Sequence, residues 1–499
     1  MHPPLIQEQS NEFNPEQVVE RLRGLPGVVL LRSASPDSAQ ARYSFVAARP
    51  FLTFRSFGSR CEITAHAARR TPHVSPSVAR VCFGDPWRVL EAWLSRYELP
   101  DEPDLPFPLG GCFGYWGYDL KNFVEPRLPR RAVRDVELPD CHVGFYDTLV
   151  VFDHHLGRSW IVSTGLQVDG TRSAEHARRQ LELWEHDLTN AAPILTLQAS
   201  RFTAHAPRIS SNLTRAGFSA RVERALDYIR AGDIYQVNLA QRLAAPRTLD
   251  GWELFQRLSA VSPAPFAAFL DFGDWQLVSS SPELFLRLSG RHILTRPIKG
   301  TRPRDLDATR DAQLTYELQT STKDMAELVM ITDLLRNDLG RVCDYGSVQV
   351  PELVRLERYA QVQHLVSTVE GRLRPEVTHL AALAACFPGG SITGAPKIRA
   401  MEIIDALEPA TRGPYTGCLG YLGFNRESLL SIVIRSALCT GAATYFHVGA
   451  GIVADSVPAA EYEETLAKAA GFLGALGMPA MSTPADGFPD RITASPGAG

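Results

Sequence analysis

The stretch FAAFLDFGDWQLVSS (residues 266–280) predicts two β-strands joined by a tight turn. Its apolar runs at residues 266–272 and 275–279 are strand-like, and the pair Gly273-Asp274 between them is typical of a turn. Helices are predicted on both sides. One covers residues 220–231 and ends at Gly232, and a longer one covers residues 311–339, with apolar residues at helical spacing, and ends before Gly340.

The first half of the chain is predicted to be rich in strands. Strand-like runs occupy residues 28–31, 43–46, 143–152 and 160–162, and a polar helical stretch follows at residues 174–188. Strands and helices therefore alternate along the whole chain. This pattern predicts an α+β protein with large sheets.

Composition excludes several classes of protein. The 499 residues are 45% hydrophobic and 21% charged, as in a globular protein, and the formal net charge of -4 gives no broad basic field for nucleic acid. Eight widely spaced cysteines without a C-x-x-C pair fit a reducing compartment, so we expect a cytoplasmic protein. No apolar run is long enough for a signal peptide or a membrane span, so no membrane association is expected.

The most informative motif is RPIKGTRPR (residues 296–304), in which Lys299 has arginines close to it in the sequence. Like charges close together disfavour the ammonium form, so Lys299 is a candidate nucleophile or base. A basic surface turn is the alternative. Glu283, at the end of a predicted strand, is a candidate proton donor that a loop could aim at the same cleft, or else a solvated carboxylate.

Three further glutamates are candidate metal ligands. Glu327 lies among apolar residues of the long predicted helix, where an unpaired carboxylate is costly, and it either binds a cation or pairs with Lys323. Glu461, Glu464 and Lys468 share one stripe of a C-terminal helix whose predicted N-cap is Ser456. Carboxylates from two helices suit Mg²⁺, although a solvated helix face also explains the stripe.

Glycine-rich segments predict sites for an anion. PGGSITGAPK (residues 388–397) has two glycines at the phosphate-loop spacing but lacks the Lys-Ser/Thr pair, so only a loop with amides exposed to an anion is expected. Gly449-Ala450-Gly451 and Arg435 offer backbone amides and a guanidinium to a carboxylate, or form a turn and a surface arginine. His364 is by default a hydrogen-bonded histidine within a sheet.

Taken in order, these motifs resemble the chorismate-utilising enzymes, which include anthranilate synthase component I, aminodeoxychorismate synthase component I, isochorismate synthase and salicylate synthase. The series runs through residues 231–239, 281–283, 297–301, 326–327 with 333–338, 364–367, 394–397, 449–451 and 461–468. The resemblance implies one large intertwined unit of two stacked, mainly antiparallel β-sheets flanked by helices. Within that unit we expect residues 1–190 to be a strand-rich amino-terminal region and residues 213–477 the chorismate-binding catalytic region. Composition predicts an irregular connection at residues 191–212, with scattered Pro, Ser and Thr, and a disordered tail at residues 478–499, which is rich in Pro, Ala, Gly and Ser.

Two positions sort the reactions within the family. Aminodeoxychorismate synthases carry a nucleophilic lysine where this chain has Lys299, and anthranilate synthases typically carry alanine there. Isochorismate and salicylate synthases carry a lysine base at the position of Gln236, and glutamine cannot take up a proton at neutral pH. The resemblance therefore implies amination of chorismate at C4 to 4-amino-4-deoxychorismate, the precursor of p-aminobenzoate and folate, by attack of Lys299 at C2 while Glu283 protonates the leaving hydroxyl.

The same resemblance implies ligands and a partner. Mg²⁺ is expected on Glu327 and Glu464, with Glu461 beside them. Ammonia is expected from a separate glutamine amidotransferase subunit, because the chain lacks a G-x-C-x-G nucleophile elbow. The residues expected to bind chorismate are Gly300, Thr301, His364, Ser391, Tyr415, Arg435, Gly449, Ala450, Gly451 and Lys468.

A regulatory or structural tryptophan site is conceivable around Ser33 and Pro263, although Arg32 stands where feedback-regulated relatives carry glutamate. Three rival functions stay open at this stage. They are 2-amination with loss of pyruvate, as in anthranilate synthase component I, a ligand-sensing protein without turnover, and a pyridoxal-phosphate enzyme using Lys299. No phosphate cup accompanies the lysine, which disfavours the last of these.

Overall fold

The structure is a computed structural model that describes residues 2–9, 13–33, 42–66, 78–99, 105–190, 209–359 and 362–478. The expected irregular connection is described only at residues 209–212, and the expected tail, apart from Met478, lies outside the described residues. None of the described helices is long and apolar enough to span a membrane.

The first sheet has, within the described residues, twelve strands in the order β1-β10-β9-β3-β2-β13-β14-β23-β24-β12-β11, and β20 also pairs with β12. Its strands are β1 (Leu5–Glu8), β2 (Val29–Arg32), β3 (Tyr43–Ala47), β9 (Thr148–Asp153), β10 (Arg158–Ser163), β11 (Ser210–Ser211), β12 (Gln236–Pro246), β13 (Phe266–Asp271), β14 (Gln276–Ser281), β20 (Gly394–Ala395), β23 (Ser436–Cys439) and β24 (Ala443–Ile452).

The second sheet also has twelve described strands, in the order β17-β19-β16-β15-β22-β21-β7-β8-β4-β5-β6, with β18 paired to β19. Its strands are β4 (Leu52–Phe57), β5 (Arg60–Ala65), β6 (Val78–Phe83), β7 (Gly111–Trp116), β8 (Cys141–Tyr146), β15 (Leu284–Ser289), β16 (His292–Arg296), β17 (Ile298–Pro303), β18 (Gln349–Arg358), β19 (Val362–Arg372), β21 (Cys418–Gly423) and β22 (Glu427–Ile432).

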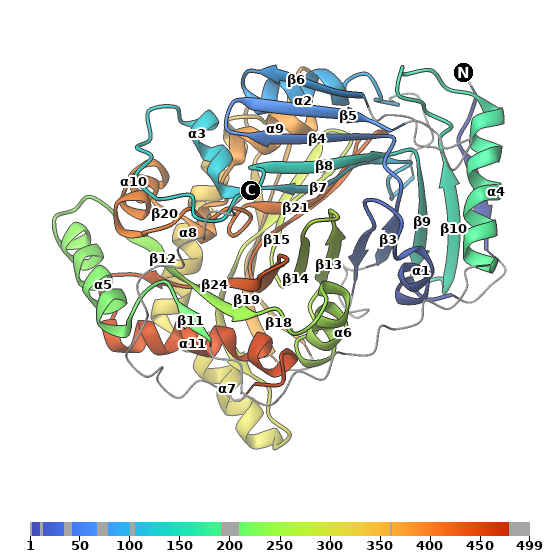
Figure 1. Ribbon diagram of the computed structural model, residues 1–499. Helices are drawn as coiled ribbons and strands as arrows, with labels where there is room; N and C mark the ends of the chain where they lie inside the picture. Colours follow the sequence, from blue (N-terminus) through green and yellow to red (C-terminus); the bar gives the residue numbers. More distant parts are fainter. Residues whose placement is uncertain are drawn as a thin grey trace, which may run out of the picture.

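Helices cover the outer faces of the two sheets (Figure 1). They are α1 (Pro15–Leu22), α2 (Pro86–Leu94), α3 (Lys121–Val124), α4 (Ala174–Asn190), α5 (Arg215–Arg230), α6 (Gly251–Val261), α7 (Ala308–Thr320), α8 (Thr322–Gly340), α9 (His379–Cys386), α10 (Lys397–Leu407) and α11 (Pro458–Ala475), with 3₁₀ turns η1 (Tyr118–Leu120) and η2 (Gly390–Ile392).

Both halves of the chain contribute to both sheets. In the first sheet β13 pairs with β2, with Ala267 opposite Arg32, and in the second sheet β21 pairs with β7, with Cys418 opposite Trp116. Both of these strand pairs are antiparallel. The predicted α+β fold, one intertwined unit with two mainly antiparallel sheets, is confirmed.

The two sheets pack face to face over a shared core. That core joins residues of the first sheet, such as Phe45 and Leu277, to residues of the second, such as Phe113 and Tyr421. Two further cores lie between each sheet and its helices, one under α1, α4, α6 and α11 and the other under α2, α8 and α9. Burial of apolar surface on both faces of both sheets stabilises this four-layer arrangement.

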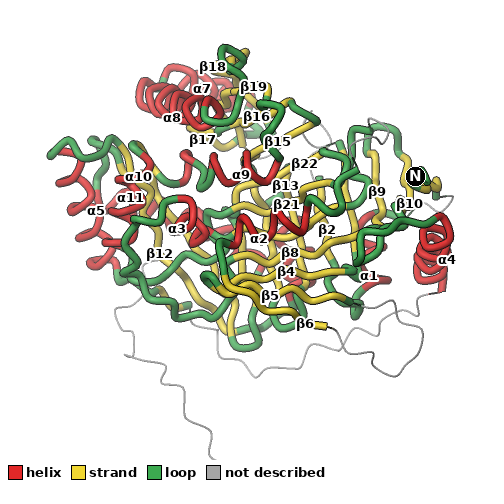
Figure 2. The backbone as a smooth tube through the Cα atoms, turned by 90° about the horizontal axis from the view of Figure 1, so that it is seen from above, coloured by secondary structure: helices red, strands yellow, loops and turns green. Residues whose placement is uncertain are grey.

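Helix α8 brings charged side chains to one end of the second sheet. Its apolar residues Leu328, Ile331 and Leu335 recur every three or four positions and are buried. Adjacent turns of the helix carry two charged residues: Glu327 pairs with Lys299 of β17, and Lys323 lies close enough to Glu461 of α11 to lower its pKa. Figure 2 shows α7 and α8 side by side against β17 and β19, so this end of the sheet is where helix carboxylates meet strand residues.

Three predicted elements differ in the structure. The helix predicted at residues 311–339 is two helices, because Ser321 ends α7 and caps α8 by accepting from the amide of Asp324 at 3.2 Å. The strand predicted at residues 143–152 is divided between β8 and β9 at Asp147. The N-cap of α11 is Val457 rather than Ser456, whose hydroxyl instead accepts from the amide of Val453 at 3.0 Å.

Candidate active site

Lys299 lies on β17 at a β-bulge. Lys299 pairs with Leu365 and Thr301 with His364, so Gly300 is the extra residue, with φ +64°. A Cβ atom at Gly300 would lie 2.7 Å from Cδ1 of Leu318, so only glycine fits the bulge without displacement. Gly300 and Thr301, predicted to bind substrate, thus shape the strand that carries the lysine.

The amine of Lys299 points toward a carboxylate rather than toward its neighbouring arginines. Its Nζ lies 3.6 Å from Oε2 of Glu327, and both side chains are at most 17% exposed. The arginines are engaged elsewhere, in ion pairs Arg296–Glu357, Arg302–Asp324 and Arg304–Asp311. The argument that neighbouring arginines disfavour the ammonium form of Lys299 finds no support in these contacts, because each arginine pairs with a carboxylate of another element.

Glu283 is buried and lies close enough to Lys299 for the charge of the lysine to act on its carboxyl group. The hydroxyl of Ser391 in η2 donates to Oε1 of Glu283 at 2.5 Å. Burial raises the pKa of Glu283 to about 7, against the opposing effects of the Ser391 hydrogen bond and the positive charge of Lys299. A carboxyl with this pKa holds its proton for a substantial fraction of the time at neutral pH, as a general acid requires.

His364 and Arg435 lie close enough to interact electrostatically. Nδ1 of His364 shares a hydrogen bond of 2.9 Å with the hydroxyl of Thr301 across β17 and β19, so the default reading of a hydrogen-bonded sheet histidine fits. Burial, followed by the charge of Arg435, lowers the pKa of His364 to about 4, so its imidazole is neutral.

Arg435 has a positive φ of +47°, a strained conformation for a residue with a side chain. No carboxylate pairs with it in the part of the chain that the structure describes, and burial lowers the pKa of its guanidinium. A strained, poorly solvated cation without a partner is suited to binding an anionic ligand.

Gly449, Ala450 and Gly451 form part of β24 rather than a turn, opposite residues 238–240 of β12. A Cβ atom at Gly449 would lie 2.9 Å from the hydroxyl of Tyr415, and one at Gly451 would lie 3.3 Å from Nε2 of Gln236. The glycines therefore leave space for these two polar side chains. Gln236 is fully buried, and both polar atoms of its carboxamide lack hydrogen-bond partners among the described residues.

The three predicted metal ligands are divided between α8 and α11. Glu464 pairs with Lys468 at 2.7 Å, and Lys468 also donates to the carbonyl of Gly449 at 2.8 Å. Glu461 is buried, and its Oε2 has no hydrogen-bond partner within the described part of the chain. Burial, followed by the charge of Glu464, raises its pKa. Lys323 of α8 lowers that pKa, which places α8 near Glu461.

These carboxylates fit a magnesium ion in chemical type. No group of three metal-ligating side chains is assembled within the described residues. Mg²⁺ is usually bound by only one or two carboxylates together with water and substrate, so a partial donor set is compatible with it. The unpartnered oxygen of Glu461 is the observation that favours a cation in this place.

The lysine of the glycine-rich segment at residues 388–397 makes contacts inside the protein. Lys397 binds both carboxylate oxygens of Asp338 at 2.8 Å and the carbonyls of Cys386 and Pro388. It is therefore fully engaged inside the protein and fixes the start of the loop that carries Ser391. Neither Lys397 nor Asp338 was predicted as a site residue.

Two cavities have a predicted site residue in their lining, Tyr415 in one and Ser33 in the other. One is lined by Arg242, Arg412, Tyr415 and His447, and the ring of Tyr415 stacks on that of His447 at 4.8 Å. The other is lined by Ser33 together with Arg32, Tyr43, Pro265, Phe266 and Tyr421. Pro263 is absent from that lining, and a tryptophan site there remains a prediction.

Comparison with known proteins identifies the family. Residues 39–474 match the family described as chorismate binding enzyme, and the chain belongs to that family. It is 41% identical over 470 residues to anthranilate synthase component 1 of Thermus thermophilus, covering 92% of this chain and 99% of that protein. It is 39% identical over 456 residues to aminodeoxychorismate synthase component 1 of Escherichia coli, covering 90% and 93%.

Solved structures agree with the fold. Anthranilate synthase component I from Streptococcus pneumoniae is 31% identical and superposes with a TM-score of 0.74, covering 87% of this chain and 93% of that one. The menaquinone-specific isochorismate synthase MenF of Escherichia coli, at 17% identity and a TM-score of 0.68, shares the fold. The chain is thus a chorismate-binding enzyme, with relatives of both amination types at similar distance.

Proposed function

We propose that the chain converts chorismate and ammonia to 4-amino-4-deoxychorismate. The observation that carries the proposal is the grouping of Lys299, Glu283 and Glu327 at one end of the second sheet, with the amine largely buried. A surface lysine would be solvated, whereas this one lies between a proton donor and a carboxylate. The buried Gln236, which cannot serve as a base for water, supports amination over hydroxylation.

Before the first step the ammonium group of Lys299 gives its proton to solvent, and the resulting neutral amine attacks C2 of chorismate. The ring double bonds shift, the C4–O bond breaks, and Glu283 gives its proton to the departing hydroxyl, which leaves as water. The product of this step is a positively charged secondary amine on Lys299 and an ionised Glu283. Burial makes Glu283 a ready donor, because its pKa of about 7 keeps the proton available at neutral pH.

In the second step ammonia attacks C4 and expels Lys299 from C2 as a neutral amine. The new C4 ammonium then returns a proton to Glu283, so that both residues regain the forms in which they entered the first step. The enolpyruvyl group at C3 is kept throughout. Arg435 and Tyr415 would hold the carboxylates of the substrate during both steps, since a fixed orientation is what makes attack at C2 efficient.

Magnesium bound by Glu327 and Glu464, with Glu461 beside them, would supply positive charge to anchor the ring carboxylate. Ammonia would come from a glutamine amidotransferase subunit, consistent with the designation component 1 in the relatives. All eight cysteines are free thiols, which supports a location in the cytoplasm. The product would feed p-aminobenzoate and folate synthesis.

The experiment is to incubate the purified chain with chorismate, ammonium and Mg²⁺ and to identify the product by mass. We expect 4-amino-4-deoxychorismate without pyruvate, and no product when Mg²⁺ is omitted. Release of pyruvate together with anthranilate would instead establish the second candidate function, which the Thermus thermophilus relative favours. An inactive chain that still binds chorismate would support a ligand-sensing role.

The covalent step has its own test. Without ammonia, the wild-type chain incubated with chorismate should gain the mass of chorismate less one water, and digestion should place this adduct on the peptide that contains Lys299. The Lys299→Ala chain should form neither the adduct nor 4-amino-4-deoxychorismate. Undiminished formation of that product by the variant would rule out covalent catalysis by this residue.

A further inference from the structure

A buried ion pair, Arg412 with Glu408, lies behind the site and takes no part in the chemistry proposed above. Arg412 is 2% exposed and Glu408 7% exposed. Nε of Arg412 donates to Oε2 of Glu408 at 2.8 Å, and Nη2 donates to Oε1 at 2.7 Å. This two-point contact fixes the plane of the guanidinium, so its remaining donors are aimed in set directions.

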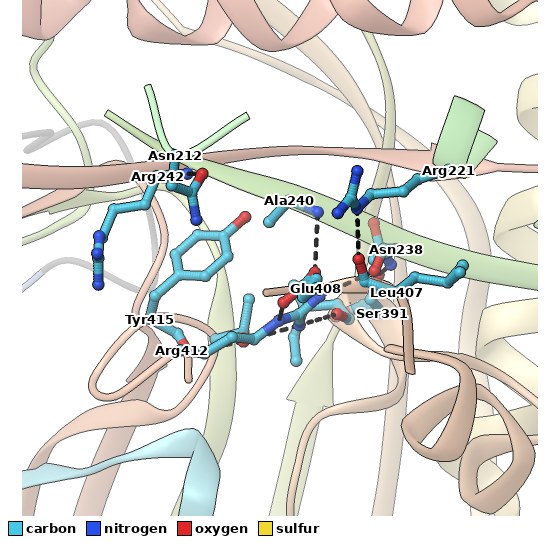
Figure 3. A network of polar contacts seen from close by, with 12 residues as sticks. Asn212, Arg221, Asn238, Ala240, Arg242, Ser391, Leu407, Glu408, Arg412 and Tyr415 are labelled. Carbon is cyan, nitrogen blue, oxygen red and sulfur yellow. Dashed lines mark hydrogen bonds and ion pairs between the residues drawn. The ribbon is translucent and has the colours of Figure 1, made fainter. Parts of the chain in front are cut away.

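Those donors hold three separate segments of the chain (Figure 3). Nη2 also donates to the carbonyl of Asn238 on β12 at 2.8 Å, and Nη1 donates to the hydroxyl of Thr416 at 3.0 Å and to the carbonyl of Ile392 at 3.4 Å. Oε1 of Glu408 accepts from the amide of Ala240. The pair therefore ties β12, the η2 loop and the turn before β21 to one point.

Each tied segment carries or touches a residue of the candidate site. Ile392 follows Ser391, whose hydroxyl donates to Glu283, and the side-chain amide of Asn238 donates to the carbonyl of Ser391 at 3.0 Å. Thr416 follows Tyr415, and the guanidinium of Arg412 lies 5.7 Å from the centroid of the Tyr415 ring. Displacement of Arg412 would therefore move the hydroxyl that bonds to the proton donor.

We propose that Arg412 is a positioning residue of the reaction, which fixes the backbone at Ser391 and so directs the Ser391 hydroxyl onto Glu283. This inference rests on the proposed function, in which Glu283 protonates the leaving hydroxyl. Arginine is required because lysine, with a compact ammonium, keeps the charge but cannot reach Glu408, Asn238, Ile392 and Thr416 together. An ion pair with a purely structural role would stabilise the fold without affecting the pKa of Glu283.

The test is the pH dependence of kcat/KM for the Arg412→Lys chain. Among the described residues, Glu283 faces the charged Lys299 of β17 and the hydroxyl of Ser391. The Ser391 hydrogen bond favours the ionised carboxyl, so its loosening should move the basic limb of the profile to higher pH, in the direction of Ser391→Ala. We also expect kcat/KM to fall by about 100-fold at neutral pH, the effect of a small misplacement.

Two variants separate positioning from stability. Arg221→Lys is the matched control, because Arg221 likewise donates to a backbone carbonyl, that of Leu407 next to Glu408, at 2.6 Å but touches no site residue. Its basic limb should not move. Glu408→Asp keeps the buried pair balanced in charge while shortening it, and should shift the limb as Arg412→Lys does even if the latter folds poorly.

The outcomes distinguish the two proposals. If the wild-type chain does not form 4-amino-4-deoxychorismate, the proposed function fails. If the wild type forms it, but Arg412→Lys and Glu408→Asp lose thermal stability while their basic limbs stay in place, the positioning role is overturned and the pair is structural. A limb that shifts in both variants, and not in Arg221→Lys, establishes the role.

Discussion

Removing the hydroxyl of Ser391 should raise the pKa of Glu283 and widen the pH range of activity on the alkaline side. That hydroxyl donates to Glu283 at 2.5 Å and favours the ionised carboxyl. A hydrogen bond to a charged group contributes about 1.5–3 kcal/mol, and one pKa unit corresponds to about 1.4 kcal/mol. Because the pKa of Glu283 is about 7, we expect the basic limb of the wild type near pH 7, and Ser391→Ala should shift it upward by about one to two pH units.

The assay is kcat/KM for chorismate between pH 5.5 and pH 9.5, with total ammonium adjusted at each pH so that the concentration of free ammonia stays constant. Without this adjustment the titration of ammonium would imitate a catalytic limb. The carboxyl stretch of Glu283 in the infrared spectrum, assigned by its loss in Glu283→Gln, reports the same pKa without turnover.

The matched control is Thr393→Val. Thr393 belongs to the same loop, is buried, and donates to the carbonyl of Gly389 at 2.7 Å without contacting Glu283. Its basic limb should stay near that of the wild type. An unchanged or lower limb in Ser391→Ala, with the infrared pKa unmoved, would refute the claim that this hydrogen bond sets the acidity of the proton donor.

Two further predictions concern stability. Folding raises the pKa of Glu283 from 4.5 to about 7, so the native state binds the proton more tightly and its stability falls as pH rises through this range. Glu283→Gln should remove that loss. In urea unfolding at pH 8 it should be more stable than the wild type by about 3 kcal/mol, while losing activity. Gly300→Ala should destabilise by about 1–3 kcal/mol and lower turnover, because it adds a clash with Leu318 to the strain of φ +64°. Gly290→Ala, at φ +54° with open space around its Cβ, supplies the control that has strain alone, and equal losses of stability in the two variants would contradict the clash.

Individual strands could be predicted because their signals are local, whereas the two-sheet fold was expected only from the resemblance of the ordered motifs to a known family. The runs at residues 266–272 and 275–279 form β13 and β14, and Lys299 lies close enough to Glu283 to act on its pKa, while the catalytic roles of these two residues stay predictions. The break between α7 and α8 also had a local signal, since Ser321 precedes Asp324 by three residues as a helix cap does. That signal was outweighed by the continuous helical periodicity of residues 311–339.

The supporting network could not be predicted, because its members have no pattern of their own. Glu408 lies at the end of a helix and Arg412 in the turn that follows, and neither position is marked in the sequence. Their role depends on contacts with β12 and η2, which come from distant parts of the chain. The arginines near Lys299 show the same limit. Sequence places them together, but their carboxylate partners come from α7, α8 and β18, and these pairings are known only once the elements are packed.

Overall identity does not choose between the two amination reactions, and the reason is physical. The relatives of each type are 41% and 39% identical to this chain, because most of the alignment reports the shared two-sheet scaffold. Under the proposed function the reaction is decided where a nucleophile meets C2: Lys299 attacks the ring there, and ammonia is directed to C4. On the same proposal, ammonia itself would reach C2 in a chain without that amine, and the reaction would end in loss of pyruvate. The residue at position 299, rather than overall identity, is therefore the position at which we expect the two reactions to separate, and the product of the Lys299→Ala chain tests this expectation.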